Sequence, residues 1–220
     1  MKIVIFDMDG VIFDSERLVL DSWEKVGKKY GIKDVGKTLT DCIGTNKVKT
    51  QMIVQEHYGK EFDYEKYSKE ASLLFREYVR ENGLPVKKGV RELLQYLKDE
   101  NIPVGLASST RLAVVEEELR QAGLYDYFQV IVGGDQLKRS KPEPDIYLMA
   151  CEKMKTAPEN AYAVEDSYNG IRAAYAAGMH PVMVPDLLPA TQEMREMSIA
   201  VFDDLDLVMR YFQSEGCLKS

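Results

Sequence analysis

Two aspartates separated by one residue follow directly on an apolar run near the start of the chain, in MKIVIFDMDG. Asp7 and Asp9 put like charges at the end of a predicted buried strand, and a second acidic pair, Glu165 and Asp166, ends the apolar run that begins at Ala161. Two unit charges about 4 Å apart repel by roughly 4 kcal/mol at an effective dielectric constant near 20. Several such repulsions rival a folding margin of about 5–15 kcal/mol. If the two strands are central in one sheet, the four carboxylates therefore need protonation, water or a cation.

Carboxylate oxygens at an open site favour a hard cation, so we predict Mg²⁺ rather than zinc. Each acidic pair taken alone also fits a solvated loop end. Matching chemistry is predicted at two further places. Ser108, Ser109 and Thr110 precede a predicted helix, where hydroxyl and backbone N–H groups either bind an anion or simply cap the helix. Lys141 lies in a loop restricted by prolines, where it either neutralises a phosphate and an aspartate or is an exposed charge.

The elements that must position these residues are short apolar runs with helical patterns between them. A run that is apolar on both faces suits a strand that is covered on both sides, as in a parallel sheet. The predicted strands are Ile3–Phe6, Pro103–Ala107, Val130–Val132, Ala161–Val164, Val182–Val184 and, more weakly, Ala200–Phe202. The predicted helices are Val90–Lys98, Leu112–Ala122, Asp145–Met154, Asn169–Ala177 and Leu205–Phe212, and Gly123 and Gly178 stand at C-terminal cap positions. This alternation predicts an α/β fold with a doubly wound parallel sheet, whose ligand sites lie at the carboxyl ends of the strands.

One segment breaks the alternation, because it has helical patterning and almost no strand signal. Apolar residues recur at helical spacing at Val19, Trp23, Val26 and Tyr30, and residues 64–79 form another helical pattern. We therefore predict an all-helical domain of residues 15–82 inserted into a core made of residues 1–14 and 83–220.

Composition limits the function classes. Of the 220 residues, 45% are hydrophobic and 30% are charged, as in an ordinary globular protein. The net charge of −7 argues against a nucleic-acid partner, and the 3 cysteines form no CxxC pair, which fits a reduced compartment. The first apolar run is too short for a signal peptide, and no run reaches the roughly 18 apolar residues of a membrane span. We expect a cytoplasmic protein without a membrane partner.

Four stretches, FDMDGVIFDSE, ASST, SKPEPDIY and VEDSYNGIRAA, resemble in this order the motifs of the haloacid dehalogenase superfamily of phosphohydrolases. The helical insertion after the first motif is similar to the cap of the subgroup that includes β-phosphoglucomutase and many sugar-phosphate phosphatases. The resemblance extends from Ile3 to about Met183. Its motifs are specific for the superfamily and unspecific for the substrate, and they imply a Rossmann-like core with a helical cap.

The resemblance assigns the chemistry to residues of the core. It makes Asp7 the nucleophile, which forms an aspartyl-phosphate, and Asp9 the acid that protonates the leaving oxygen and then activates water. Ser108 and nearby backbone N–H groups, including that of Ser109, would hold the phosphoryl oxygens with the help of Lys141. An aspartate at position 9 argues against dehalogenation, because the dehalogenases of the superfamily lack that second acid.

The same resemblance implies a Mg²⁺ site. Its ligands would be the Asp7 carboxylate, the Asp9 backbone carbonyl and Asp166, with Glu165 as a further or water-mediated ligand. Gly10 would let the chain turn sharply between these groups.

The cap is expected to close over the site and set specificity. The stretch CIGTNK resembles the cap's substrate-specificity loop, in which Gly44 allows close backbone approach and Thr45 and Lys47 meet the substrate. An ordinary loop at the start of a helix explains these residues equally well.

Three departures separate the chain from the mutase pattern. Val19, Lys47 and Leu112 stand where β-phosphoglucomutase has a cap histidine, an arginine and an asparagine. We therefore predict a phosphatase for a small phosphorylated metabolite, a sugar or polyol phosphate, for which a monomer suffices. A mutase or an inorganic pyrophosphatase on the same scaffold stays an alternative. A receiver-type phospho-acceptor module is a third, although its acidic residues and phospho-acceptor lie on different strands and it has no helical insertion.

Overall fold

A single parallel sheet forms the centre of the larger unit. The computed structural model describes residues 2–42, 47–214 and 218. Its strands are β1 Ile3–Phe6, β2 Val104–Ser108, β3 Val130–Gly133, β4 Ala161–Glu165, β5 His180–Met183 and β6 Ala200–Val201. In this part of the chain the strands form one 6-stranded sheet in the order β3-β2-β1-β4-β5-β6, and every pairing is parallel. The predicted α/β fold with a doubly wound parallel sheet is confirmed.

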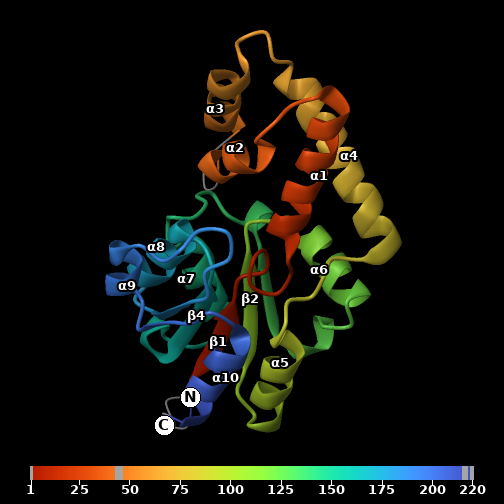
Figure 1. The fold of residues 1–220 in the computed structure, drawn as a ribbon. Helices are drawn as coiled ribbons and strands as arrows, with labels where there is room; N and C mark the ends of the chain where they lie inside the picture. The colour runs from red at the N-terminus through yellow and green to blue at the C-terminus, as the bar shows by residue number, and fades with distance from the viewer. Residues whose placement is uncertain (1, 43–46, 215–217, 219–220) are drawn as a thin grey trace. The chain divides into compact units, whose positions relative to one another are not determined.

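Helices cover both faces of this sheet. They are α5 Val90–Asp99, α6 Leu112–Gln121, α7 Asp145–Lys153, α8 Tyr168–Ala176, α9 Gln192–Met197 and α10 Leu205–Ser214. Figure 1 shows α5, α6 and α10 on one side of the strands and α7, α8 and α9 on the other. No helix within the described ranges has both the length and the apolar composition needed to cross a membrane.

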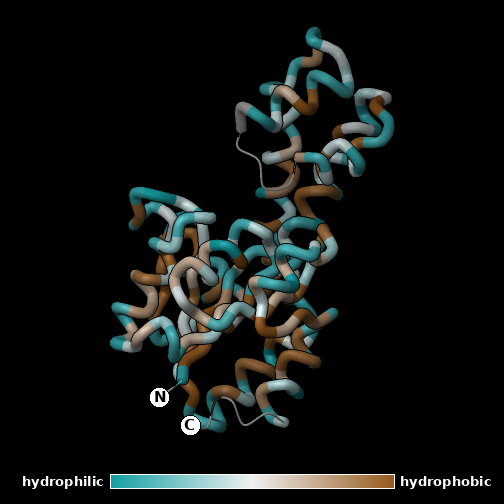
Figure 2. The backbone as a smooth tube through the Cα atoms, turned by 90° about the vertical axis from the view of Figure 1, so that its left-hand side faces the viewer, coloured by the Kyte–Doolittle hydropathy of each residue, from teal (hydrophilic) through white to brown (hydrophobic). Residues whose placement is uncertain are grey.

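Burial on both faces explains the composition of the strands. Every residue of β1, β2 and β4 is buried, so each position needs an apolar or small side chain. Apolar stretches accordingly recur along the tube of the core in Figure 2, while polar residues occupy many outer turns. β1 lies between β2 and β4, with Val4 paired to Val104 on one side and to Tyr162 on the other. The strand order reverses at β1, and its carboxyl end is therefore the switch point at which such sheets bind ligands.

Many element ends differ by one or two residues from the predicted bounds, and the differences at β5, β2 and α9 have a physical reason. β5 begins at His180, because that residue pairs with Tyr162 and continues the parallel ladder beyond the apolar run. β2 extends to Ser108, a residue predicted to follow the strand. Helix α9 was not predicted, since it has only 6 residues; the Thr191 side chain caps it, and Met194 is its buried residue. Gly123 and Gly178 have φ angles of 68° and 80°, which confirms their C-terminal cap positions.

The chain divides into two compact units, residues 1–14 with 85–220 and residues 15–84. Within the second unit the described elements are α1 Ser15–Tyr30, α2 Val35–Cys42, α3 Lys47–Tyr58 and α4 Tyr64–Asn82. Helices α1 and α4 pack through aromatic side chains. The Trp23 and Tyr67 ring centroids are 5.0 Å apart, and the Tyr67 hydroxyl donates to the Trp23 carbonyl at 2.6 Å.

The core segments on either side of the helical unit are joined to each other. The Asp14 N–H donates to the Pro85 carbonyl at 2.9 Å, and the Lys87 N–H donates to the Ile12 carbonyl at 2.9 Å. Phe13 and Val86 form an antiparallel bridge between them. The core is therefore closed by its own backbone at the point where residues 15–84 are inserted.

Candidate active site

Asp7 and Asp9 lie at the carboxyl end of β1, on either side of a buried methionine. A tight turn follows, in which the Gly10 N–H donates to the Phe13 carbonyl at 2.9 Å. Gly10 has a φ of 75°, and a Cβ added to it would lie 2.2 Å from Asp166 Oδ2. A side chain at this position is therefore both strained and blocked. The predicted sharp turn is confirmed. It brings the backbone at Gly10 close to the Asp166 carboxylate.

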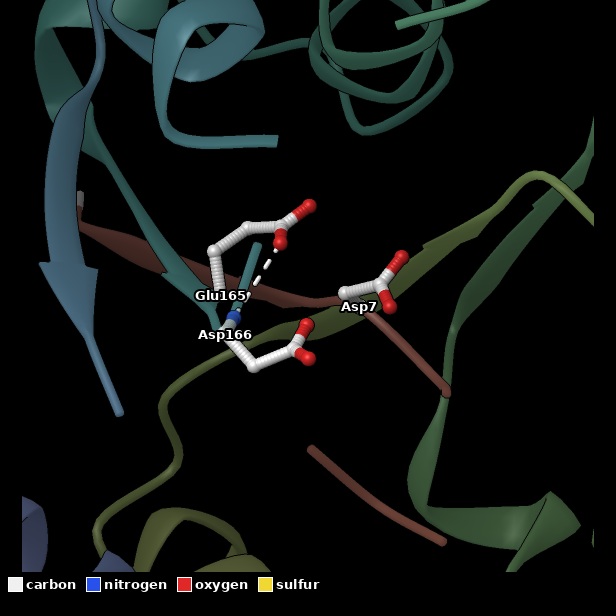
Figure 3. A group of neighbouring side chains, drawn as sticks. All are labelled: Asp7, Glu165 and Asp166. Atoms are coloured by element: carbon white, nitrogen blue, oxygen red, sulfur yellow. Dashed lines mark hydrogen bonds between the residues drawn. The ribbon is translucent and has the colours of Figure 1, made fainter. Parts of the chain in front are cut away.

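Three carboxylates converge beside this turn. One oxygen from each of Asp7, Glu165 and Asp166 lies within 4.8 Å of the others. Figure 3 shows the three side chains at neighbouring strand ends, with the Asp7 and Asp166 carboxylates facing the same space. An all-oxygen set of this kind can hold a hard divalent cation such as Mg²⁺. The residues present therefore fit the predicted ion.

Lys141 provides the positive charge of the cluster. Its Nζ lies 2.5 Å from Asp7 Oδ1 and 2.6 Å from Glu165 Oε1, and it donates to the Ala107 carbonyl at 3.3 Å. Only 8% of the side chain is exposed. Burial by itself would lower the pKa of Lys141, but the carboxylates of Asp7 and Glu165 outweigh burial and raise the pKa above its usual range. The lysine is therefore positively charged at neutral pH.

One ammonium does not neutralise the cluster. Burial raises the pKa of Asp7 to about 8; Lys141 opposes this rise, and the charges of Glu165 and Asp9 add to it. A second cation beside Asp7 would favour its ionised form. The raised pKa of Asp7 and the three carboxylate ligands therefore both favour a bound cation.

Both carboxylate oxygens of Glu165 are held by hydrogen bonds. Its side chain is fully buried, and its Oε1 accepts from Lys141 and from the Tyr147 hydroxyl at 2.7 Å. Its Oε2 accepts from the Asp166 N–H at 3.1 Å, the Ser167 N–H at 3.2 Å and the Ser167 hydroxyl at 3.1 Å. A Cβ added to Gly170 would lie 1.9 Å from the same carboxylate, so α8 must have glycine there. These five contacts leave Glu165 little free capacity for a metal ion.

The segment after β2 lies beside Asp9. Ser108 is fully buried, and its Oγ accepts from the Thr110 N–H at 3.0 Å, while Ser109 is exposed. The Thr110 hydroxyl donates to Asp9 Oδ2 at 3.2 Å. Sequence reasoning named Thr110 beside Ser108 and Ser109 at a possible anion site, but it did not predict the contact between Thr110 and Asp9.

A family model described as haloacid dehalogenase-like hydrolase matches residues 4–184. The chain belongs to this family. The resemblance drawn from the four motifs is thereby confirmed, and the alternative of a receiver-type module is set aside. As a member of this family, the chain is an enzyme.

Relatives of this hydrolase are named for phosphorylated small molecules. It is 35% identical to the phosphorylated carbohydrates phosphatase of Thermotoga maritima, with 83% of this chain and 84% of the relative covered. It is 32% identical to hexitol phosphatase B of Escherichia coli K12, with 82% of each covered. Among solved structures, a putative β-phosphoglucomutase from Thermotoga maritima superimposes with a TM-score of 0.80 at 30% identity, covering 98% of this chain and 100% of that one.

The residues predicted in the cap of the hydrolase cannot be placed in the same way. Gly44 and Thr45 lie outside the described residues, as does the side chain of Lys47. Their contact with substrate stays a prediction. The two histidines, in contrast, are placed. His57 lies 3.2 Å from Asp41 within the helical unit, and His180 Nε2 bonds the Glu159 carbonyl at 3.0 Å.

Glu118, on α6, is a partly buried carboxylate of the hydrolase that sequence reasoning missed. Its Oε2 is buried and has no hydrogen-bond partner within the described part of the chain. Burial, and then the charges of Asp9 and Glu117, raise its pKa from the ordinary 4.5 to about 7. The folded protein therefore retains a proton that the unfolded chain releases. Its ionisation costs no stability below pH 4.5, costs progressively more up to pH 7, and has its full cost above pH 7.

We expect the variant Glu118→Gln to be more stable than the wild type at pH 8 by about 1–3 kcal/mol, and nearly unchanged at pH 4.5. Urea unfolding followed by circular dichroism at both pH values measures this difference. Glu117→Gln, an exposed neighbour on the same helix, is the matched control and should change little at either pH. An equal effect of Glu118→Gln at both pH values would contradict the assignment of a buried, ionising group.

Proposed function

We propose that this hydrolase releases phosphate from a small phosphorylated metabolite, a sugar or polyol phosphate, through a phosphorylated Asp7. The observation that carries the proposal is the buried Lys141 ammonium between the carboxylates of Asp7 and Glu165, with a second acid, Asp9, two residues beyond the nucleophile. Relatives named as phosphatases support the enzyme class, a phosphoric monoester hydrolase.

In the first step an Asp7 oxygen attacks phosphorus and the bond from phosphorus to the leaving oxygen breaks. Asp9 gives its proton to that oxygen, so the product leaves as an alcohol. Lys141 offsets the charge on the transferring group, and the Ser108 hydroxyl donates to a phosphoryl oxygen. In the second step Asp9 takes a proton from water, which attacks phosphorus and releases phosphate and Asp7. The Thr110 hydroxyl, bonded to Asp9 Oδ2, holds that acid in place.

Asp7, Asp166 and the Asp9 backbone carbonyl would hold Mg²⁺, with Glu165 contributing as a further or water-mediated ligand. Bound Mg²⁺ supplies positive charge that offsets the carboxylates and the phosphoryl oxygens. The close passage of Gly10 by Asp166 supports this assignment, since it leaves the Asp166 carboxylate facing the backbone of the first motif.

The substrate class is supported by the relatives named for phosphorylated carbohydrates and hexitols. Within the cap, Gly44, Thr45 and Lys47 are our candidates for contacts to the leaving group. A mutase is the second candidate, favoured by the likeness to the putative β-phosphoglucomutase structure. Val19 and Leu112, which replace two polar residues of the mutase pattern, weigh against it.

Phosphate release from a panel of hexose, pentose and polyol phosphates, nucleotides and pyrophosphate tests the proposal. We expect a preference for one sugar or polyol phosphate, and at least about a 100-fold loss of rate when EDTA removes the metal, with recovery on adding Mg²⁺. An unchanged rate in EDTA would contradict the metal role. Preference for pyrophosphate would identify the enzyme as an inorganic pyrophosphatase that uses the same mechanism. Isomerisation of a hexose phosphate without phosphate release would establish the mutase.

A further inference from the structure

Tyr147, on α7, contacts two residues of the candidate site, although sequence reasoning gave it no role. Its side chain is wholly buried. The hydroxyl donates to Glu165 Oε1 at 2.7 Å, and the Lys141 Nζ lies 5.1 Å from the centre of the ring. One side chain therefore acts on both a carboxylate and the ammonium paired with it.

The contact to Glu165 falls on an oxygen that is shared. Oε1 accepts from the Tyr147 hydroxyl and from the Lys141 ammonium, at 2.7 and 2.6 Å. The other oxygen is held by Asp166 and Ser167, so the carboxylate cannot rotate to offer a different atom. The charge on Oε1 is consequently divided between a neutral donor and a cation.

The same ammonium faces two anions at almost equal distance, Asp7 at 2.5 Å and Glu165 at 2.6 Å. Where it rests depends on how strongly each attracts it. A hydroxyl bonded to Oε1 weakens the attraction from Glu165, and the ring face attracts the ammonium from a third direction. Without the hydroxyl, the ammonium would shift toward Glu165 and away from Asp7.

We propose that Tyr147 is a positioning residue, which keeps the Lys141 ammonium at Asp7 by satisfying part of the hydrogen-bonding capacity of Glu165 Oε1. The inference rests on the proposed function, in which Lys141 offsets the charge of the transferring group. An ordinary phenol is neutral at the pH of an assay, so the hydroxyl stays a donor to Glu165 Oε1.

The variant Tyr147→Phe removes the hydroxyl and keeps the ring. With the best substrate of the panel at saturating Mg²⁺, we expect kcat to fall about tenfold and KM to stay within twofold, because the substrate does not touch the phenol. Tyr127→Phe is the matched control: its hydroxyl donates to Gln95 at 2.9 Å in the same unit, and neither residue belongs to the four motifs. It should leave both constants unchanged.

A double-mutant cycle with Glu165→Gln tests whether Tyr147 acts through Glu165. Because three donors converge on Oε2, the glutamine oxygen should occupy that position and its NH₂ group should face Tyr147. In this background the change to phenylalanine should alter kcat less than twofold. A full tenfold loss there would overturn the proposal.

The Lys141 ammonium provides a readout without substrate. In protein labelled with ¹⁵N-lysine, its Nζ resonance, identified by its loss in Lys141→Met, should move in Tyr147→Phe and stay in place in Tyr127→Phe. An unmoved resonance, or a kcat within twofold of the wild type despite a lower melting temperature, would make Tyr147 merely structural and overturn the inference. Failure of the proposed function would differ, since the wild type itself would then release no phosphate.

Discussion

Asp7→Asn is expected to abolish phosphate release, by at least about 10³-fold, while the protein stays folded. The amide has the size of the carboxylate but is not a nucleophile, so no phosphorylated enzyme can form. Lys141 keeps its partner Glu165 at 2.6 Å, so the ammonium is not left unpaired. The fold should therefore tolerate the change, with a melting temperature within a few degrees of the wild type.

The measurement is phosphate release under single-turnover and steady-state conditions, with circular dichroism as the check on folding. Borohydride treatment of the quenched wild-type reaction should convert the phosphorylated Asp7 to homoserine, which mass spectrometry locates in the first peptide. Asp126→Asn, an exposed aspartate of the core, is the control and should retain full activity. Residual activity of several per cent in Asp7→Asn would show that a different group attacks phosphorus.

Lys141→Met is expected to have the second large effect, on stability as well as on activity. It leaves two buried carboxylates, Asp7 and Glu165, without the cation that lies 2.5 and 2.6 Å from them. Removing one partner of a buried ion pair typically costs about 3–5 kcal/mol, because the remaining charge stays desolvated. Loss of charge compensation at the transferring group should also lower kcat by about 10²–10³-fold.

Urea unfolding measures the first effect and phosphate release the second. Lys138→Met, an exposed lysine of the same loop, is the matched control, for which we expect a change within about 0.5 kcal/mol. A loss below about 1 kcal/mol in Lys141→Met would contradict the assignment of this lysine as the cation that compensates the buried carboxylates.

The sheet and the acidic residues at its edge could be predicted because their signals are local. An unbroken apolar run such as Ile3–Phe6 marks a strand covered on both faces, and the charges that end it mark its exit from the core. The carboxyl ends of parallel strands share one edge, so Asp7 and Glu165 were expected to converge if their strands were central in one sheet, and β1 and β4 are neighbours.

The supporting residues could not be predicted, because their partners are distant in sequence. Tyr147 sits in an apolar helical pattern and reads as a core residue; its hydroxyl meets Glu165 only after α7 has packed on the sheet. Asp135 similarly accepts from the Leu112 N–H at 2.8 Å and caps α6 from another segment. Local sequence patterns therefore predict the charged residues of the site but not the residues that hold them in position.

The hydrogen bond between the Asp14 N–H and the Pro85 carbonyl has a consequence for how this protein can change. Residues 15–84 are an insertion, and the core residues at its two ends are already hydrogen-bonded to each other. Loop-closure entropy grows slowly with length, so the core should accept a shorter, longer or unrelated segment between these ends at small cost. Natural or laboratory recombination can therefore replace the helical unit with another segment. The residues proposed for phosphoryl transfer all lie outside residues 15–84 and would not change.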